Sequence, residues 1–126
     1  MKRDVGLFLL RFLTGGMMLI SHGWPKLANF TNMSSQFPDP IGLGSTFSLT
    51  LAVFAEFFCA IALIAGVMTR WMAVPLLITM LVAAIVIHGD DPWGKKEFAL
   101  LYAIPFLSLI FTGAGRLSLD SLMGRD

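Results

Sequence analysis

The sequence predicts an all-α integral membrane protein, a four-helix bundle with both termini in the cytoplasm. Two observations support this fold class. Hydrophobic residues make up 56% of the 126 residues and charged residues only 13%, about half the charge of a typical soluble domain. A small soluble core cannot bury so many apolar side chains, because small domains leave much of their surface in water. The apolar residues also fall into four long runs, which lack the alternation typical of barrel strands.

The four runs predict helices over approximately residues 5–21, 47–68, 71–87 and 98–112 of one domain that covers residues 1–126. A hydrocarbon core of about 30 Å needs about 20 helical residues, with a range of about 17–25. The second run meets this requirement easily, and the first and third lie near the lower limit. The fourth run is short and contains Pro105, so a kinked or partly re-entrant helix is the alternative to a full span.

The first run has one feature of a signal peptide, since Lys2 and Arg3 precede it. However, Arg11 interrupts the apolar residues, and Ile20 to Gly23 do not form a small-residue cleavage site. We therefore expect the first run to be a retained transmembrane helix.

The basic residues predict the orientation of the bundle. With four spans, one side carries Lys2, Arg3, Arg70, Arg116 and Arg125, and the other side carries Lys26, Lys95 and Lys96. Basic residues near span ends favour the cytoplasmic side, which places both termini inside. The stretch 22–46 between the first two helices then lies outside. Its length predicts that it has structure of its own or covers the outer mouth of the bundle.

Two ionisable residues fall well inside the predicted spans. Arg11 lies about 9 Å from the inner side and Glu56 about 14 Å from the outer side, at 1.5 Å per residue. A charge at the bilayer centre costs at least about 2.5–3.5 kcal/mol, so such residues are candidates for function or pairing. If their helices are neighbours, we expect an Arg11–Glu56 ion pair. The alternative for Arg11 is that its long side chain reaches toward the inner headgroups.

Further polar residues gather at the outer ends of the helices, and each alone is typical of a solvated rim. Together they predict a polar pocket that opens outward and reaches down to the two buried charges. The candidate pocket residues are Arg11, His22, Lys26, Glu56, His88 and Glu97.

Several classes of site receive no support from the residues. The single cysteine, Cys59, cannot form an intramolecular disulfide and is typical of a small packing residue. No catalytic triad, phosphate loop or metal-ligand motif is present, so we expect no metal. The net charge of +1 gives no reason to expect a nucleic-acid partner.

Five groups of residues carry a resemblance to a known family. They are Arg11, the stretch from His22 to Leu27, Glu56, the turn from Gly66 to Arg70, and the last helix with its ending at residues 97–102 and 111–120. In this order and spacing they resemble DoxX-type membrane proteins over nearly the whole chain. The resemblance implies a four-helix, multi-pass protein of a bacterial-type inner membrane. The family is named for its similarity to a thiosulfate:quinone oxidoreductase subunit.

The resemblance and the pocket together predict a redox-associated membrane subunit that binds a quinone or a small sulfur compound. Arg11 or Lys26 would hold an anionic group, and Glu56 or a histidine would transfer protons. No cofactor of its own is evident, so electrons would come from the ligand or from a partner redox protein. The sequence leaves open whether the protein is an enzyme.

Two other classes of function are compatible with the sequence. One is a non-enzymatic membrane protein that binds lipid or protein, or that acts as an assembly chaperone. The resemblance implies this class because related eukaryotic proteins look like assembly chaperones. The other is a small transporter, for which four helices would need a homo-oligomer. In every case the lipid bilayer is an expected partner.

Overall fold

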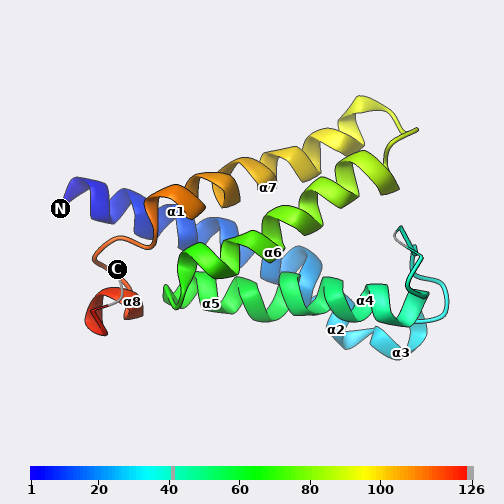
Figure 1. The fold of residues 1–126 in the computed structure, drawn as a ribbon, viewed down its shortest axis with the longest axis horizontal. Coiled ribbons are helices and arrows are strands. Elements are labelled where there is room, and N and C mark those ends of the chain that lie inside the picture. Colours follow the sequence, from blue (N-terminus) through cyan, green and yellow to red (C-terminus); the bar gives the residue numbers. More distant parts are fainter. Residues whose placement is uncertain (41, 125–126) are drawn as a thin grey trace.

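A computed structural model describes residues 1–40 and 42–124, and every regular element within these residues is helical (Figure 1). Three continuous helical stretches are long and apolar enough to cross a membrane, Lys2–Ala28, Ser45–Ala65 and Thr69–Ile87. They correspond to the first three predicted runs, so the helical class and these three helices are confirmed.

The first stretch consists of α1 (Lys2–Met18), a π-helical turn η1 (Leu19–Gly23) and α2 (Trp24–Ala28), and the short helix α3 (Phe30–Met33) follows. The predicted end at residue 21 is therefore too early. In the π turn the Trp24 amide donates to the Leu19 carbonyl oxygen, five residues back. A new helical segment thus starts at Trp24, and Pro25 lies in its first turn. Proline is tolerated there because the first N–H groups of a helix have no partner within the helix.

The second and third stretches also contain a π turn each. The second is α4 (Ser45–Val53), η2 (Phe54–Cys59) and α5 (Ala60–Ala65), and it ends at Gly66, which has a φ of 76°. This left-handed ending stops the helix before residue 68, the predicted end. The third stretch is α6 (Thr69–Val82) and η3 (Ala83–Ile87).

The last long helix, α7 (Trp93–Thr112), packs along α6 as an antiparallel hairpin (Figure 1). It begins before the predicted residue 98 and continues through Pro105. This helix is long enough to cross a membrane, but its first turns carry Lys95, Lys96 and Glu97. These three charged residues make it less apolar than the other three stretches. A fourth crossing therefore stays a prediction.

The N-terminus and the short helix α8 (Leu119–Leu122) lie at one end of the molecule, which we call the terminal end (Figure 1). Helix α3 and the connection 88–92 lie at the opposite end, which we call the loop end. It stays a prediction that the terminal end faces the cytoplasm. Arg125, one of the basic residues on which that prediction rests, lies outside the described residues.

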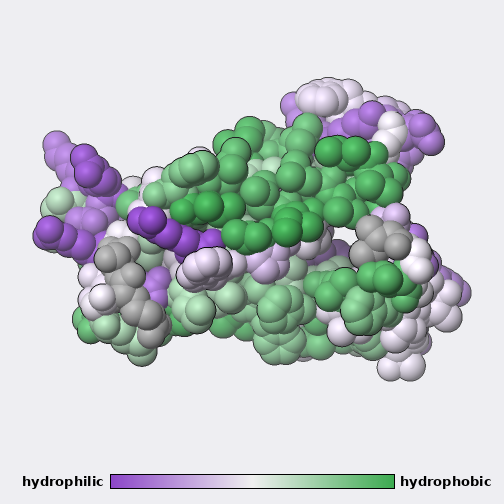
Figure 2. Space-filling view, viewed as in Figure 1, coloured by the Kyte–Doolittle hydropathy of each residue, from purple (hydrophilic) through white to green (hydrophobic). Residues whose placement is uncertain are grey.

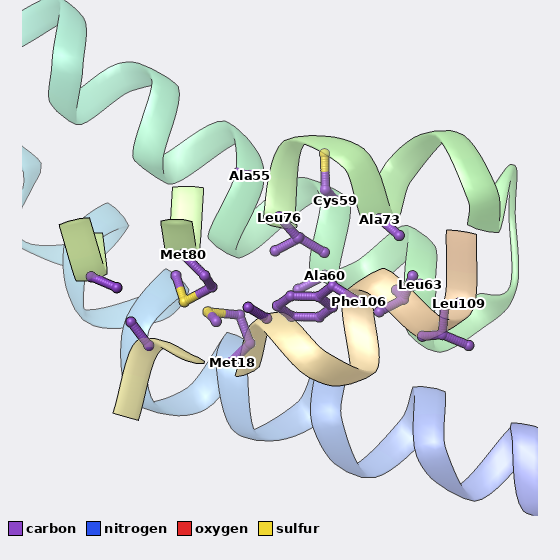
Figure 3. Close-up of a cluster of buried hydrophobic side chains, with 13 residues drawn as sticks. Met18, Ala55, Cys59, Ala60, Leu63, Ala73, Leu76, Met80, Phe106 and Leu109 are labelled. Atoms are coloured by element: carbon purple, nitrogen blue, oxygen red, sulfur yellow. The ribbon is translucent and has the colours of Figure 1, made fainter. Parts of the chain in front are cut away.

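The core lies where α1, α5, α6 and α7 meet. Phe106 is fully buried at its centre, close to Met18, Leu63 and Leu76 (Figure 3). The face of the molecule drawn in Figure 2 is also largely apolar between its two ends, and large apolar side chains are exposed on each of the long helical stretches. They include Phe12 at 48% exposed on the first stretch. An apolar belt of this kind is suited to a bilayer rather than to water.

Candidate functional site

A cavity of about 450 Å³ lies in the loop-end half of the molecule, between η1–α2, α4–η2, α6–η3 and α7. We call it the central cavity. Most of its walls are apolar. Four of the six predicted pocket residues line it, namely His22, Lys26, Glu56 and His88. The structure therefore brings these four together and places Arg11 and Glu97 elsewhere.

Glu56 forms an ion pair with Lys26, and not with Arg11. The Lys26 ammonium donates a hydrogen bond to Glu56 Oε1 at 2.5 Å. Only 4% of the Glu56 side chain and 18% of the Lys26 side chain are exposed. The predicted Arg11–Glu56 pair is thus wrong, and a buried charge pair from η2 and α2 sits at the wall of the central cavity instead.

Arg11 is fully buried at the terminal end, where its guanidinium binds backbone carbonyls. Nε donates to Ala114 O at 3.0 Å, and Nη1 donates to both Leu63 O and Ile64 O at 3.0 Å. Nη2 donates to Leu117 O. These contacts join α1 to the end of α5 and to the segment after α7. Arg11 is a structural residue in this arrangement, distant from the central cavity.

The register of the two helical stretches and the direction of the two side chains explain why Arg11 and Glu56 do not meet. The Cα–Cβ bonds of a helix tilt toward its N-terminus. The first and second stretches run in opposite directions, so Arg11 tilts toward the terminal end and Glu56 toward the loop end. Their backbones are also far apart along the bundle, because Gly23 packs against Glu56 and Arg11 lies twelve residues before Gly23, about 18 Å along the helix at 1.5 Å per residue.

The segment after α7 completes the terminal end. The Asp120 carboxylate accepts hydrogen bonds from the amides of Met68 at 2.7 Å and Thr69 at 3.0 Å, at the start of α6. The Asp120 amide donates to Gly66 O at 2.9 Å. The family-like residues at 66–70 and 111–120 therefore form one structural junction with Arg11.

Two histidines and Tyr102 of α7 line the central cavity. The His22 ring lies edge-on to Tyr102, with ring centroids 5.4 Å apart. His88 Nδ1 lies 2.7 Å from Asp91 Oδ2, and this hydrogen bond lowers the pKa of Asp91. Glu97 is exposed and does not line the cavity.

The three π turns all lie beside the central cavity. His22 lies in η1, Glu56 lies in η2, and η3 ends at Ile87, directly before His88. A π turn shifts the helical phase locally and is frequent at functional sites. Periodicity alone did not indicate these turns.

One residue does carry a sequence signal for the close approach of η1 and η2. A Cβ atom on Gly23 would lie 2.2 Å from the Glu56 carbonyl oxygen, so only glycine fits. This contact brings the His22–Lys26 segment against Glu56. A glycine between two polar candidates could have been recognised as such a position.

The connection between the first two helices covers the loop end of the cavity, as the sequence predicts. Phe37, Pro38 and Pro40 line the cavity. The Asp39 carboxylate accepts hydrogen bonds from the Gly44 amide at 2.9 Å and from the Ser48 hydroxyl at 3.0 Å. The Gly44 hydrogen bond is the main cause that lowers the pKa of Asp39. The connection is thus anchored to the start of α4.

The chemistry of the cavity is that of an amphipathic binding site. Its apolar walls suit a ring or a chain, and the Lys26–Glu56 pair with His22 and Tyr102 offers donors and acceptors to a polar group. Cys59 is fully buried in the core and does not line the cavity. Within residues 1–40 and 42–124, the His, Cys, Asp and Glu side chains form no group of three or more that could hold a metal.

Comparison with known proteins agrees with this architecture. An uncharacterised protein of Haemophilus influenzae is 32% identical over 126 residues, which cover 94% of this chain and 83% of that protein. The inner membrane protein YqjF of Escherichia coli is 27% identical over 126 residues, which cover 97% of this chain and 95% of that protein. No solved structure matches the chain.

The family comparison covers the first three helical stretches. Residues 6–89 match the DoxX family, and this range includes Arg11, the His22–Lys26 segment, Glu56 and His88. The chain therefore belongs to the DoxX family and is a multi-pass inner-membrane protein.

Proposed function

We propose that this DoxX protein binds the headgroup of a quinone in the central cavity and serves as a redox-associated membrane subunit. The observation that carries the proposal is the Lys26–Glu56 ion pair, which is largely withdrawn from solvent at the wall of an otherwise apolar cavity. In this proposal the protein has four spans and cytoplasmic termini, so the cavity opens toward the outer face.

The ion pair supports binding because buried charges are expensive unless they are paired or used. An ammonium group can donate to a quinone carbonyl oxygen. A carboxylate and an imidazole can exchange the protons that accompany quinone reduction. Glu56 and His22 line the same cavity and are suited to that role. The electrons would come from a partner redox protein.

A small sulfur compound is the weaker candidate for the same cavity. Such an anion would have to leave water for walls formed mainly by side chains such as Leu51, Ile78 and Phe98. Lys26 offers a positive charge, but Glu56 already neutralises it. The apolar walls therefore favour a ring-shaped, uncharged headgroup.

A non-enzymatic lipid-binding or assembly protein is the second candidate function. The exposed apolar side chains favour it, because they place the cavity next to membrane lipid. A lipid headgroup with hydrogen-bonding groups would contact the same charge pair. The two candidates differ in whether the bound molecule is redox-active.

The test is to purify the protein in mild detergent, extract the bound molecules, and quantify quinones and lipids by mass spectrometry. We expect about one quinone per protein chain. Glu56→Gln should reduce this amount by about tenfold, because it leaves the Lys26 ammonium without its buried counter-charge. Glu97→Gln is the matched control, since Glu97 is exposed and lies outside the cavity.

Two results would count against the proposal. Phospholipid in place of quinone would favour the non-enzymatic function. Equal quinone retention by Glu56→Gln and Glu97→Gln would show that the Lys26–Glu56 ion pair does not contribute to quinone binding.

A further inference from the structure

A second cavity of about 660 Å³ lies between α1 and α7, which we call the lateral groove. Its side on the first helical stretch includes Thr14 and Met17 of α1 and Ser21 of η1, whose spacing places them on one helix face. Its α7 side includes Leu101 and Pro105. The neighbouring face of α1 carries Arg11, Gly15 and Met18, which are buried against the rest of the bundle.

The lateral groove and the central cavity share a wall. Five residues line both spaces, namely His22, His88, Lys95, Phe98 and Tyr102. The edge-on pair of His22 and Tyr102 is part of this shared wall. A molecule that fills both spaces would therefore pass beside these two rings.

The lateral groove changes in polarity along its length. Its loop end holds His22, His88 and Lys95, where it meets the central cavity. Its deeper end holds Thr14, Met17, Leu101 and Pro105, which carry no ionisable group and whose side chains are apolar except for the Thr14 hydroxyl. From Lys95 to Pro105 the groove follows α7 for about 15 Å at 1.5 Å per residue, or about half of a 30 Å hydrocarbon core.

The sides of the groove belong to the apolar belt. Met17 is 60% exposed, Leu101 is 58% exposed and Phe98 is 72% exposed. In a membrane protein these side chains contact acyl chains, so the groove faces the bilayer rather than the aqueous phase.

We propose that the lateral groove holds the hydrocarbon tail of the ligand whose headgroup occupies the central cavity, and that the ligand enters from the bilayer between α1 and α7. This inference rests on the proposed function. The shared wall and the polarity gradient argue for one head-and-tail molecule, with its polar part at the ion pair and its apolar part along Thr14 and Met17. The substrate class is thus a membrane-dissolved quinone with a hydrocarbon tail rather than a water-soluble compound.

The covered loop end supports the same route. Phe37, Pro38 and Pro40 lie over the central cavity there, and Asp39 anchors them to α4 through Ser48. A ligand that arrives between α1 and α7 does not need to displace this anchored connection.

The test compares two probes with the same benzoquinone headgroup, one with a decyl tail and one without a tail. Equilibrium binding to the full-length protein in lipid nanodiscs is measured for each. Thr14→Trp should fill the groove and weaken binding of the tailed probe by about tenfold, because apolar contacts with the tail are lost. Binding of the tailless probe should change by less than about twofold, because Thr14 does not line the central cavity.

Leu13→Trp is the matched control, because Leu13 precedes Thr14, is 55% exposed and lines neither cavity. It should leave both probes unaffected. Ser21→Trp is a second groove variant that keeps the test valid if Thr14→Trp does not fold.

The outcomes separate the two proposals. If both groove variants bind the tailed probe as well as Leu13→Trp does, the lateral route is wrong and headgroup binding in the central cavity stands. If they weaken both probes equally, the groove does not act on the tail, and the inference is again wrong. If the unmodified protein binds neither probe, the proposed function fails and the inference fails with it.

Discussion

At the scale of single residues, the two charged residues that lie inside the predicted spans, Arg11 and Glu56, have different roles. Arg11 binds backbone carbonyls at the terminal end, where it satisfies acceptors that helix α5 and the segment after α7 leave open. Glu56 is paired with Lys26 beside the central cavity. The same membrane rule singles out both residues, but their surroundings make one a structural junction and the other a candidate binding group.

Arg11→Met should destabilise the protein without acting on the cavity. The change leaves several buried carbonyl oxygens without donors, so we expect the free energy of unfolding to fall by about 3 kcal/mol. Thermal unfolding in detergent micelles, followed by circular dichroism, measures the loss. Arg70→Met is the control, because Arg70 is exposed. A fall of similar size in both variants would contradict the role assigned to Arg11.

At the scale of the elements, π turns and one close helix contact shape the site. The turns η1, η2 and η3 bring His22, Glu56 and His88 to the same cavity from three different helical stretches. Gly23 permits η1 to lie against the backbone of Glu56. The geometry of the cavity therefore depends on backbone packing as much as on the polar side chains.

A pair of glycine substitutions tests this contact. Gly23→Ala would place a Cβ atom 2.2 Å from the Glu56 carbonyl oxygen, so the helices must separate. Gly16→Ala meets no atom within 4 Å, and alanine favours a helix over glycine by about 1 kcal/mol. We therefore expect a lower melting temperature and weaker quinone retention for Gly23→Ala, and an equal or higher melting temperature for Gly16→Ala. Equal tolerance of both changes would show that the contact does not limit packing.

At the scale of the whole molecule, the face drawn in Figure 2 carries an apolar band between two more polar ends. Helices α6 and α7 form a hairpin, and the N-terminus and α8 share the terminal end (Figure 1). If α7 also crosses the bilayer, both termini lie on the side that the basic residues favour, which is the cytoplasm.

Labelling of single cysteines in intact cells tests this topology. Cys59 is fully buried, so the natural cysteine should give little background. A membrane-impermeant maleimide should label Asp90→Cys, in the connection before α7, and should reach Lys2→Cys and Met123→Cys only after the cells are opened. Labelling of Met123→Cys in intact cells would show that α7 returns without crossing.

The sequence by itself determined that this protein lies in a lipid bilayer and that it is helical. It also identified the ionisable residues that fall inside the apolar runs. Composition and run length are summed over many residues, so they predict the membrane class and three confirmed helices. The helical spacing of Leu49, Ala52, Glu56, Cys59 and Leu63 also predicts one face, and all five side chains are buried. Four of the six candidate pocket residues, His22, Lys26, Glu56 and His88, line one cavity, and their role in binding stays a prediction.

Only the tertiary structure decided which of these residues meet. The register and direction of the first two helical stretches separate Arg11 from Glu56, and the segment after α7 folds back to contact Arg11. The π turns change the phase of three helices, and a glycine contact sets the distance between two of them. These features depend on pairs of elements far apart in the chain, whereas periodicity describes one element at a time. The contacts between distant elements therefore decide that Arg11 has a structural role and that Glu56 lies at the wall of the cavity.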